Sequence, residues 1–280
     1  MIHKTFYFDH HKIKIFGQYW EPKNPKAVIL LVHGMGEHSS RYEHSVVPQL
    51  VQNDVAIMSF DNFGHGKSGG KRGHTPGYEA MMELIDKLLE KVKKQFPSLP
   101  ILLYGHSMGG NLVINYSLRK ESNIVGVVAT SPFLKLAFEP PAWKVIIGRV
   151  LQRIAPSVTL ATGLEVNAIS QDPEEVKKYI EAPLIHDRIS PNFSFPVMDA
   201  GAWAIENAAL LNLPMLILHG TKDRIVDYNG SVLFSNKTDK VDLQLIENGY
   251  HELHNDIEKQ SVFAIINQWL NTKIKIDSAQ

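Results

Sequence analysis

The sequence predicts an α/β protein with a mostly parallel, eight-stranded sheet flanked by helices and interrupted by an inserted helical cap. Two observations lead to this fold class. Short, continuously apolar segments alternate with amphipathic helical segments, as is typical of parallel strands that are buried on both faces. This alternation stops near Pro132 and resumes near Pro214, with no segment of the core-strand type between them.

The composition excludes several classes of function. Lysine plus arginine equals aspartate plus glutamate at 29 each, so no long-range field favours a nucleic-acid partner. The absence of cysteine excludes disulfides, thiolate metal sites and a cysteine nucleophile, and it is consistent with a cytoplasmic protein. The N-terminal residues lack the apolar h-region of a signal peptide, and no apolar run approaches the roughly 18 residues of a membrane span. Any membrane contact is therefore expected to be peripheral.

The first part of the chain supplies six of the expected strands. Residues 5–9 and 12–20 alternate polar and apolar side chains and predict a pair of strands. Four continuously apolar strands follow, at residues 27–32, 55–60, 101–104 and 124–129. Apolar residues at helical spacing predict intervening helices, at residues 42–52, 78–96 and 112–118.

The remainder of the chain completes the core after the insertion. It predicts two strands and a closing amphipathic helix, at residues 214–218, 242–246 and 257–270. Residues 1–132 and 212–280 are thus expected to form the core, and residues 133–211 the cap. In one cap segment the apolar residues share a helical face: Trp143, Ile146, Ile147, Val150, Leu151 and Ile154. Basic residues occupy the opposite face: Lys144, Arg149 and Arg153.

A glycine-flanked serine marks the first candidate catalytic residue. Gly105 and Gly109 bracket Ser107 in the pattern G-x-S-x-G, directly after a buried strand and at the start of a helix. That context predicts a nucleophile elbow, in which a sharp turn exposes the serine hydroxyl at the end of an α/β-hydrolase sheet. The alternative is a serine that only caps the helix.

A serine hydroxyl needs a base, and in this fold the chain order is serine, acid, histidine. Asp223 follows the strand at 214–218, and His251 follows the strand at 242–246. Both therefore lie at the same sheet edge as Ser107, where such folds bind ligands. Asp227 is the rival carboxylate, but it lies further into a predicted helix. The sequence thus predicts Ser107, Asp223 and His251 as nucleophile, acid and base.

The tetrahedral intermediate of acyl transfer also needs hydrogen-bond donors for its oxyanion. The backbone amide of Met108, next after the nucleophile, is one candidate. The amide of Met35, in the loop after the first buried strand, is the other. No metal-ligand cluster and no complete phosphate-binding loop is found in the sequence, so neither a metal nor a cofactor is expected.

Several motifs in the chain resemble the monoacylglycerol lipase and lysophospholipase branch of α/β-hydrolases. In chain order they are HGMGEHSSRY, DNFGHGKSGG, GHSMGG, HGTKD and YHELHND, and the late-cap segment EAPLIHD is similar as well. The resemblance implies that Glu37, Arg41 and His254 help to hold a glycerol head group. Alternatively, Glu37 and Arg41 form an ion pair that braces the loop. Ser40 stands where the family often has glycine.

Together these features predict a serine hydrolase that cleaves carboxylic esters of fatty acids through an acyl-enzyme on Ser107. The substrate expected first is monoacylglycerol, giving glycerol and free fatty acid. The cap helix around residues 143–154 is expected to line an apolar acyl tunnel and to rest on membrane. The alternatives are a lysophospholipase, a short-chain carboxylesterase, or a catalytically silent fold that binds lipid. The oligomeric state is left open.

Overall fold

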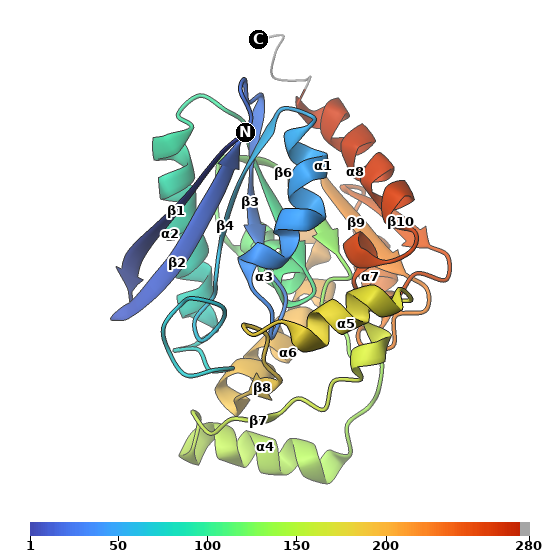
Figure 1. The fold of residues 1–280 in the computed structure, drawn as a ribbon. Helices are drawn as coiled ribbons and strands as arrows, with labels where there is room; N and C mark the ends of the chain where they lie inside the picture. The colour runs from blue at the N-terminus through green and yellow to red at the C-terminus, as the bar shows by residue number, and fades with distance from the viewer. Residues whose placement is uncertain (275–280) are drawn as a thin grey trace.

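The computed structural model describes residues 1–274, which fold around a sheet of eight strands (Figure 1). The strands lie in the order β1-β2-β4-β3-β5-β6-β9-β10. Pairing is antiparallel between β1, β2 and β4, and parallel in the rest of the sheet, which confirms the predicted fold class. The strand bounds are β1 Ile2–His10, β2 Ile13–Glu21, β3 Ala27–Val32, β4 Val55–Phe60, β5 Ile101–His106, β6 Ile124–Thr130, β9 Met215–Gly220 and β10 Val241–Ile246.

The central strands are continuously apolar because both faces of the sheet are covered. Every residue of β3, β4, β5 and β9 is buried. Along β3, Val28 and Leu30 pack into the core on one face, whereas Ile29 and Leu31 pack into the core on the other. Burying a side chain of this size stabilises the fold by about 1.5–3 kcal/mol. The edge strand β10, by contrast, is partly exposed.

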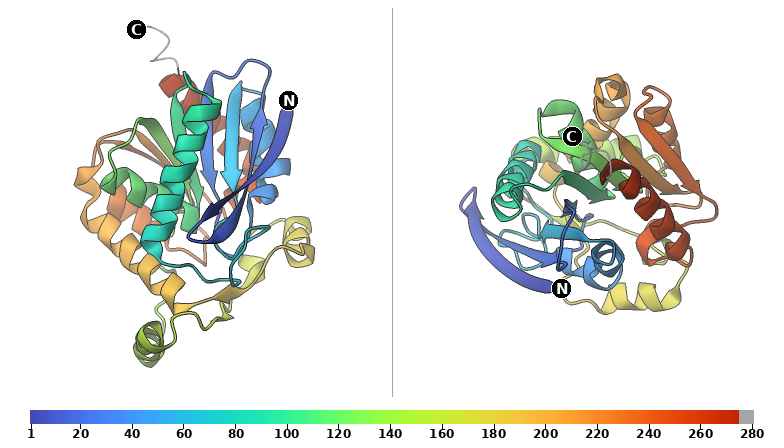
Figure 2. Two further views of the ribbon diagram at one scale, coloured as in Figure 1. Left: turned by 90° about the vertical axis from the view of Figure 1, so that its left-hand side faces the viewer. Right: turned by 90° about the horizontal axis from the view of Figure 1, so that it is seen from above.

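Helices cover both faces of the sheet (Figures 1 and 2). Apolar residues of α2 (Tyr78–Gln95) and α3 (Met108–Arg119) belong to the core on one face. Those of α1 (Val46–Val51) and α8 (Lys259–Ile274) belong to the core on the other face. Helix α7 (Tyr228–Ser235) follows β9 and adds Phe234 to the first of these cores. These helices leave the carboxyl ends of the parallel strands uncovered.

The helix predicted at residues 42–52 is divided in the structure. A 3-10 helix, η1 (Ser39–His44), precedes α1, and Ser45 between them has a non-helical backbone. Pro48 accounts for the division, since proline has no N–H and is tolerated only in the first turn of a helix. With α1 beginning at Val46, Pro48 occupies that first turn.

The segment between β6 and β9 lies across the carboxyl ends of the parallel strands (Figure 1). Its elements are α4 (Ala142–Ile154), β7 (Leu160–Ala161), η2 (Val166–Ala168), α5 (Pro173–Glu181), β8 (Arg188–Ile189), α6 (Pro191–Glu206) and η3 (Ala208–Leu210). Within the described part of the chain, β7 and β8 pair with each other and not with the main sheet.

Helix α6 is held against α3 by two buried asparagines. The side-chain amide of Asn111 donates to the carbonyls of Phe133 and Val197, at 2.8 and 3.0 Å. The amide of Asn115 donates to the carbonyl of Ala200 at 3.2 Å. These bonds satisfy backbone carbonyls of α6 and of the segment that leads into the insertion. They therefore fix α6 relative to α3.

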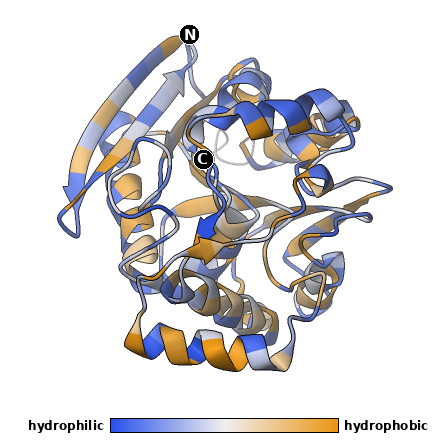
Figure 3. Cartoon of the chain, turned by 60° about the horizontal axis from the view of Figure 1, so that its bottom comes forward, coloured by the Kyte–Doolittle hydropathy of each residue, from blue (hydrophilic) through white to orange (hydrophobic). Residues whose placement is uncertain are grey.

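Helix α4 presents its apolar face to solvent. Trp143, Ile146 and Ile154 are 60%, 64% and 74% exposed, and Figure 3 shows apolar residues along this helix at the bottom of the molecule. The opposite side of the helix contacts Phe195 of α6. The Arg149 guanidinium lies 4.4 Å from the centroid of that ring, and Gly148 packs against the same ring so closely that a Cβ would lie 2.5 Å from it. No helix in the described part of the chain is both long and apolar enough to cross a bilayer.

Candidate active site

Ser107 occupies a sharp turn between β5 and α3. Its backbone φ is +53°, a strained value for a residue other than glycine, of the kind that clusters at active sites. The turn leaves no room for neighbouring side chains. A Cβ added to Gly105 would lie 2.2 Å from the carbonyl oxygen of Gly109, and one added to Gly109 would lie 2.0 Å from that of Val32. The two glycines of the motif are therefore required by the shape of the backbone.

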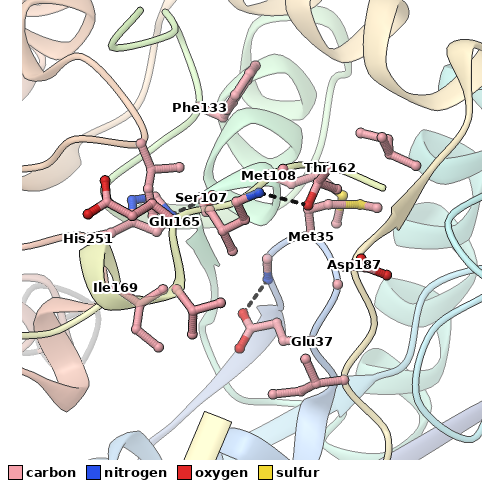
Figure 4. A pocket seen from close by; sticks show the side chains of 18 of the residues that line it. Met35, Glu37, Ser107, Met108, Phe133, Thr162, Glu165, Ile169, Asp187 and His251 are labelled. Atoms are coloured by element: carbon pink, nitrogen blue, oxygen red, sulfur yellow. Dashed lines mark hydrogen bonds between the residues drawn. The ribbon is translucent and has the colours of Figure 1, made fainter. Parts of the chain in front are cut away.

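The structure brings the three predicted catalytic residues into one hydrogen-bonded chain. Figure 4 shows two of them, Ser107 and His251, side by side at the cavity. Nε2 of His251 lies 2.9 Å from the hydroxyl oxygen of Ser107. Nδ1 of the same ring lies 2.7 Å from Oδ2 of Asp223. An ionised carboxylate can only accept, so the proton of the neutral imidazole belongs on Nδ1. Nε2 is then free to accept the hydroxyl proton of Ser107.

Asp223 is fixed in place by its other contacts. Its Oδ1 accepts hydrogen bonds from the backbone amides of Ile225 and Val226, both at 2.9 Å. Nε2 of His219 lies 3.3 Å from Oδ2. The rival carboxylate, Asp227, is turned elsewhere. It caps the N-terminus of α7 and forms an ion pair with Lys135.

The buried pair of Asp223 and His251 shifts the pKa of both groups. Burial alone would lower the pKa of His251, but the carboxylate of Asp223 outweighs it and raises that pKa. Burial alone would raise the pKa of Asp223, but His251 and His219 lower it instead. Asp223 therefore stays ionised, and His251 becomes a stronger base than an isolated imidazole.

We expect kcat/KM for ester substrates to fall on the acid side of the raised His251 pKa. Protonated His251 cannot accept the proton of Ser107, so activity is present above this pKa and is lost as the pH falls through it. In Asp223→Asn the residual activity should extend to lower pH, because burial lowers the His251 pKa and only the smaller effects of Glu252 and Glu37 then oppose it. Rate profiles from pH 5 to 9 test this. An unmoved acid limb in Asp223→Asn, or an equal shift in Asp227→Asn, would contradict the assignment.

The two predicted oxyanion donors lie beside the serine. Met108 is the first residue of α3, so its amide has no acceptor within the helix. The positive end of the α3 dipole lies at the same place. Met35 and Met108 both line the cavity that contains Ser107 and His251. Their positions are those that the sequence predicted, and their role remains a prediction.

A cavity of about 780 Å³ opens at Ser107 and His251. Its walls are mainly apolar, with residues from the sheet edge and from the insertion, including Phe133, Leu136, Phe138, Ile169, Phe193 and Val197. None of the described residues of α4 lines it. The expectation that the helix at 143–154 lines the acyl site is therefore wrong. That helix lies on α6 through Gly148 and Arg149, and α6 supplies part of the cavity wall.

The residues implied for the glycerol head group lie at different depths. Glu37 lines the cavity, whereas Arg41 and His254 do not belong to its wall. Oε1 of Glu37 accepts from the Tyr42 hydroxyl and the Gly34 amide, both at 2.6 Å. His254 is fully buried and stacks on Tyr42 with ring centroids 5.0 Å apart.

Arg41 forms the ion pair that the sequence offered as an alternative role. Its Nε lies 3.2 Å from Oε2 of Glu37, and its Nη2 donates to Glu252. The three side chains are at most 8% exposed. The guanidinium also lies over the ring of Tyr179 in α5, 4.8 Å from its centroid. Arg41 thus ties the loop after β3 to the loop of His251 and to the insertion.

Two residues of the site, Ser131 and Glu252, were not predicted from the sequence. The hydroxyl of Ser131 donates to the backbone carbonyl of His251 at 2.7 Å and holds its loop. In the sequence, Ser131 and Pro132 mark only the point where the alternation of strands and helices stops. Glu252 lies in the cavity wall, directly after His251. Its link to Arg41, 211 residues away in the chain, leaves no local signal.

Known proteins resemble the chain throughout most of its length. A family model described as serine aminopeptidase, S33, matches residues 23–258. A monoacylglycerol lipase of Mycolicibacterium smegmatis is 30% identical over 92% of this chain and 93% of its own length. An uncharacterized abhydrolase domain-containing protein of Dictyostelium discoideum is 32% identical over 91% of this chain, which spans 27% of that protein.

A solved structure of a monoacylglycerol lipase is also similar to this chain. The crystal structure of Paleococcus ferrophilus monoacylglycerol lipase matches with a TM-score of 0.84 and 36% identity, over 91% of this chain and 98% of that one. The resemblance noted from the motifs is therefore confirmed for the fold and for the branch of hydrolases.

Proposed function

Because the chain belongs to the serine aminopeptidase S33 family of α/β-hydrolases, we propose that it cleaves monoacylglycerols to glycerol and free fatty acid. The family and the monoacylglycerol lipase relatives make it a carboxylic ester hydrolase. One observation carries the proposal. The hydrogen-bonded chain of Ser107, His251 and Asp223 stands at an apolar cavity large enough for an acyl chain.

In the proposed reaction Ser107 attacks the acyl carbon while Nε2 of His251 takes its proton. The amides of Met35 and Met108 stabilise the oxyanion, and each such donor typically lowers the barrier by about 3–4 kcal/mol. His251 then protonates the leaving glycerol oxygen. Water, activated by His251, attacks the acyl-enzyme and releases the fatty acid. Asp223 stays ionised throughout and stabilises the imidazolium.

The cavity suits a long acyl chain of loosely defined length. Burial of each methylene contributes about 0.8 kcal/mol, so affinity should grow with chain length until the cavity is filled. Discrimination by one methylene in an apolar pocket is only about 1–3 kcal/mol. The glycerol end would meet Glu37 and Glu252, carboxylates that accept from hydroxyl groups. Arg41 and His254 do not line the cavity and would act indirectly, by positioning these carboxylates and their loops.

In this proposal residues 133–211 form a cap whose outer helix, α4, docks on the membrane that holds the substrate. Five apolar side chains of this helix are more than half exposed: Trp143, Ile146, Ile147, Val150 and Ile154. An amphipathic helix with such a face lies in the interfacial plane of a bilayer. Helix α4 packs on α6, which lines the cavity, so docking through α4 would bring the active site close to the lipid.

Replacing Trp143, Ile146 and Ile154 together with serine should weaken binding to phosphatidylcholine vesicles at least about tenfold, since each buried apolar side chain contributes roughly 1.5–3 kcal/mol. Hydrolysis of monoacylglycerol in vesicles should fall with it, and hydrolysis of a soluble short ester should not. Vesicle sedimentation and the two rates are the measurements. Leu210→Ser with Ile257→Ser removes exposed apolar residues elsewhere and serves as the control. Equal losses in both variants would rule out docking through α4.

The substrate assignment is tested by release of free fatty acid from monoacylglycerol, diacylglycerol and lysophosphatidylcholine, beside a short p-nitrophenyl ester. Preference for monoacylglycerol is the expected result. Preference for lysophosphatidylcholine would make the protein a lysophospholipase, and activity confined to the short ester would make it a carboxylesterase. A protein that binds lipid but neither turns over esters nor reacts with a fluorophosphonate probe would be a silent binding fold.

A further inference from the structure

Two consecutive histidines at the β1–β2 turn meet a glutamate of α2. Nε2 of His11 lies 2.7 Å from Oε2 of Glu83, and Nε2 of His10 lies 3.9 Å from the same oxygen. All three potential ligand atoms lie within 4.8 Å of one another. His11 and Glu83 are separated by 72 positions in the sequence, so only the fold brings the glutamate to the two histidines.

The local packing holds both rings with their Nε2 atoms near the carboxylate. The ring of Phe63 contacts both imidazoles, with centroids 5.8 Å from His10 and 6.2 Å from His11. Nε2 of His10 is buried and has no hydrogen-bond partner among the described residues, which is costly for a polar atom. The backbone of His11 is left-handed, with φ of +49°, and this turn lets adjacent side chains converge on one point.

We propose that His10, His11 and Glu83 bind a divalent transition-metal ion, with zinc as the ion the ligand set fits best. Zinc sites of two histidines and one glutamate use Zn–N and Zn–O distances of about 2.0–2.2 Å. Tetrahedral ligands at those distances lie roughly 3.3 Å apart. The observed 2.7 and 3.9 Å separations from Glu83 bracket that value, so small side-chain rotations suffice. A water molecule would complete the coordination.

The two lysines that act on the cluster are paired with other carboxylates. Lys87, one turn along α2 from Glu83, donates to Glu90, and Lys120 donates to Glu79. None of the three ligands lines the catalytic cavity. The ion would therefore join the β1–β2 turn to α2 and stabilise the fold, without taking part in ester cleavage.

Calorimetric titration of the tag-free protein with ZnCl₂, beside thermal unfolding with and without zinc, tests the site. We expect one zinc ion per chain and a Tm that rises with zinc concentration. Glu83→Gln and His11→Asn should each weaken zinc binding at least about tenfold, the range typical of damaged metal sites. Asparagine is chosen because it tolerates the left-handed turn at His11. Mg²⁺, which prefers oxygen ligands, should not raise the Tm.

His44→Asn is the matched control, since it removes an exposed histidine outside the cluster. It should leave zinc affinity and the zinc-dependent Tm unchanged. Absence of zinc binding to the unmodified protein would overturn the proposal. So would unchanged zinc affinity in a variant with both His10→Asn and His11→Asn, because the ion would then bind elsewhere, for example at His251.

Discussion

Ser107→Ala should lower kcat for ester hydrolysis by about four to six orders of magnitude and abolish labelling by a fluorophosphonate probe. The hydroxyl is the proposed nucleophile, and among the described residues no second serine hydroxyl is hydrogen-bonded to the imidazole ring of His251. The variant should still fold, since alanine differs from serine only by the oxygen. Steady-state rates on a soluble ester and intact-protein mass after probe treatment are the measurements.

Asp223→Asn and Asp227→Asn form a matched pair around this prediction. Loss of the carboxylate that orients His251 should lower kcat about 10⁴-fold. Asp227→Asn should retain near-normal kcat, because asparagine caps a helix as well as aspartate does and Asp227 bonds Lys135 and Asn229 rather than His251. Near-normal turnover by Ser107→Ala, or an equal loss in both aspartate variants, would refute the catalytic assignment.

Arg41→Met should cost about 3–5 kcal/mol of folding stability. Methionine would leave the buried carboxylates of Glu37 and Glu252 without their cation, and breaking a buried ion pair from one side carries this penalty. Urea unfolding followed by circular dichroism gives the change in free energy. Arg188→Met is the matched control, because the pair of Arg188 with Asp187 is exposed and such pairs contribute about 0–1 kcal/mol.

The same variant separates the two roles considered for Arg41. If Arg41 is a brace, all ester substrates should lose activity in step with the loss of stability. If it also positions Glu37 for a glycerol head group, KM for monoacylglycerol should rise more than KM for a p-nitrophenyl ester. A stability change no larger than that of Arg188→Met would show that the buried network contributes little.

The positions of the strands along the chain and the meeting of Ser107, Asp223 and His251 could be predicted because their signals are local. A buried parallel strand is continuously apolar, and the sharp turn after it needs glycines around the serine. The apolar run of β5 followed by Gly105-x-Ser107-x-Gly109 therefore predicts both the strand and the candidate nucleophile. The positions of Asp223 and His251 follow from the rule that the strand ends share one sheet edge. The separation of η1 from α1 depended on Pro48, a local signal that was not used.

The sequence could not predict which way the apolar face of α4 points or how deeply the side chains of Glu37 and Arg41 are buried. The pattern of α4 defines an apolar face, but the same pattern suits a face turned to the cavity or to lipid. Its true direction depends on the stacking of Arg149 on Phe195, a contact between distant segments. Likewise, the spacing of Glu37 and Arg41 cannot show that one reaches the cavity and the other lies behind it. The cluster of His10, His11 and Glu83 was invisible for the same reason.

The asparagine bonds join α6 to α3, so we expect α6 to be the least mobile part of the insertion. Swinging α6 away from the sheet would break the bonds from Asn111 to Val197 and from Asn115 to Ala200, and each buried group left unsatisfied costs about 1–3 kcal/mol. We therefore expect entry of substrate and exit of fatty acid to depend on the outer segments, where Arg149 of α4 contacts Phe195 and Asp199 of α6. The bonded wall is built on α3, the helix that begins beside the proposed nucleophile, so any opening of the cavity should leave that wall in place.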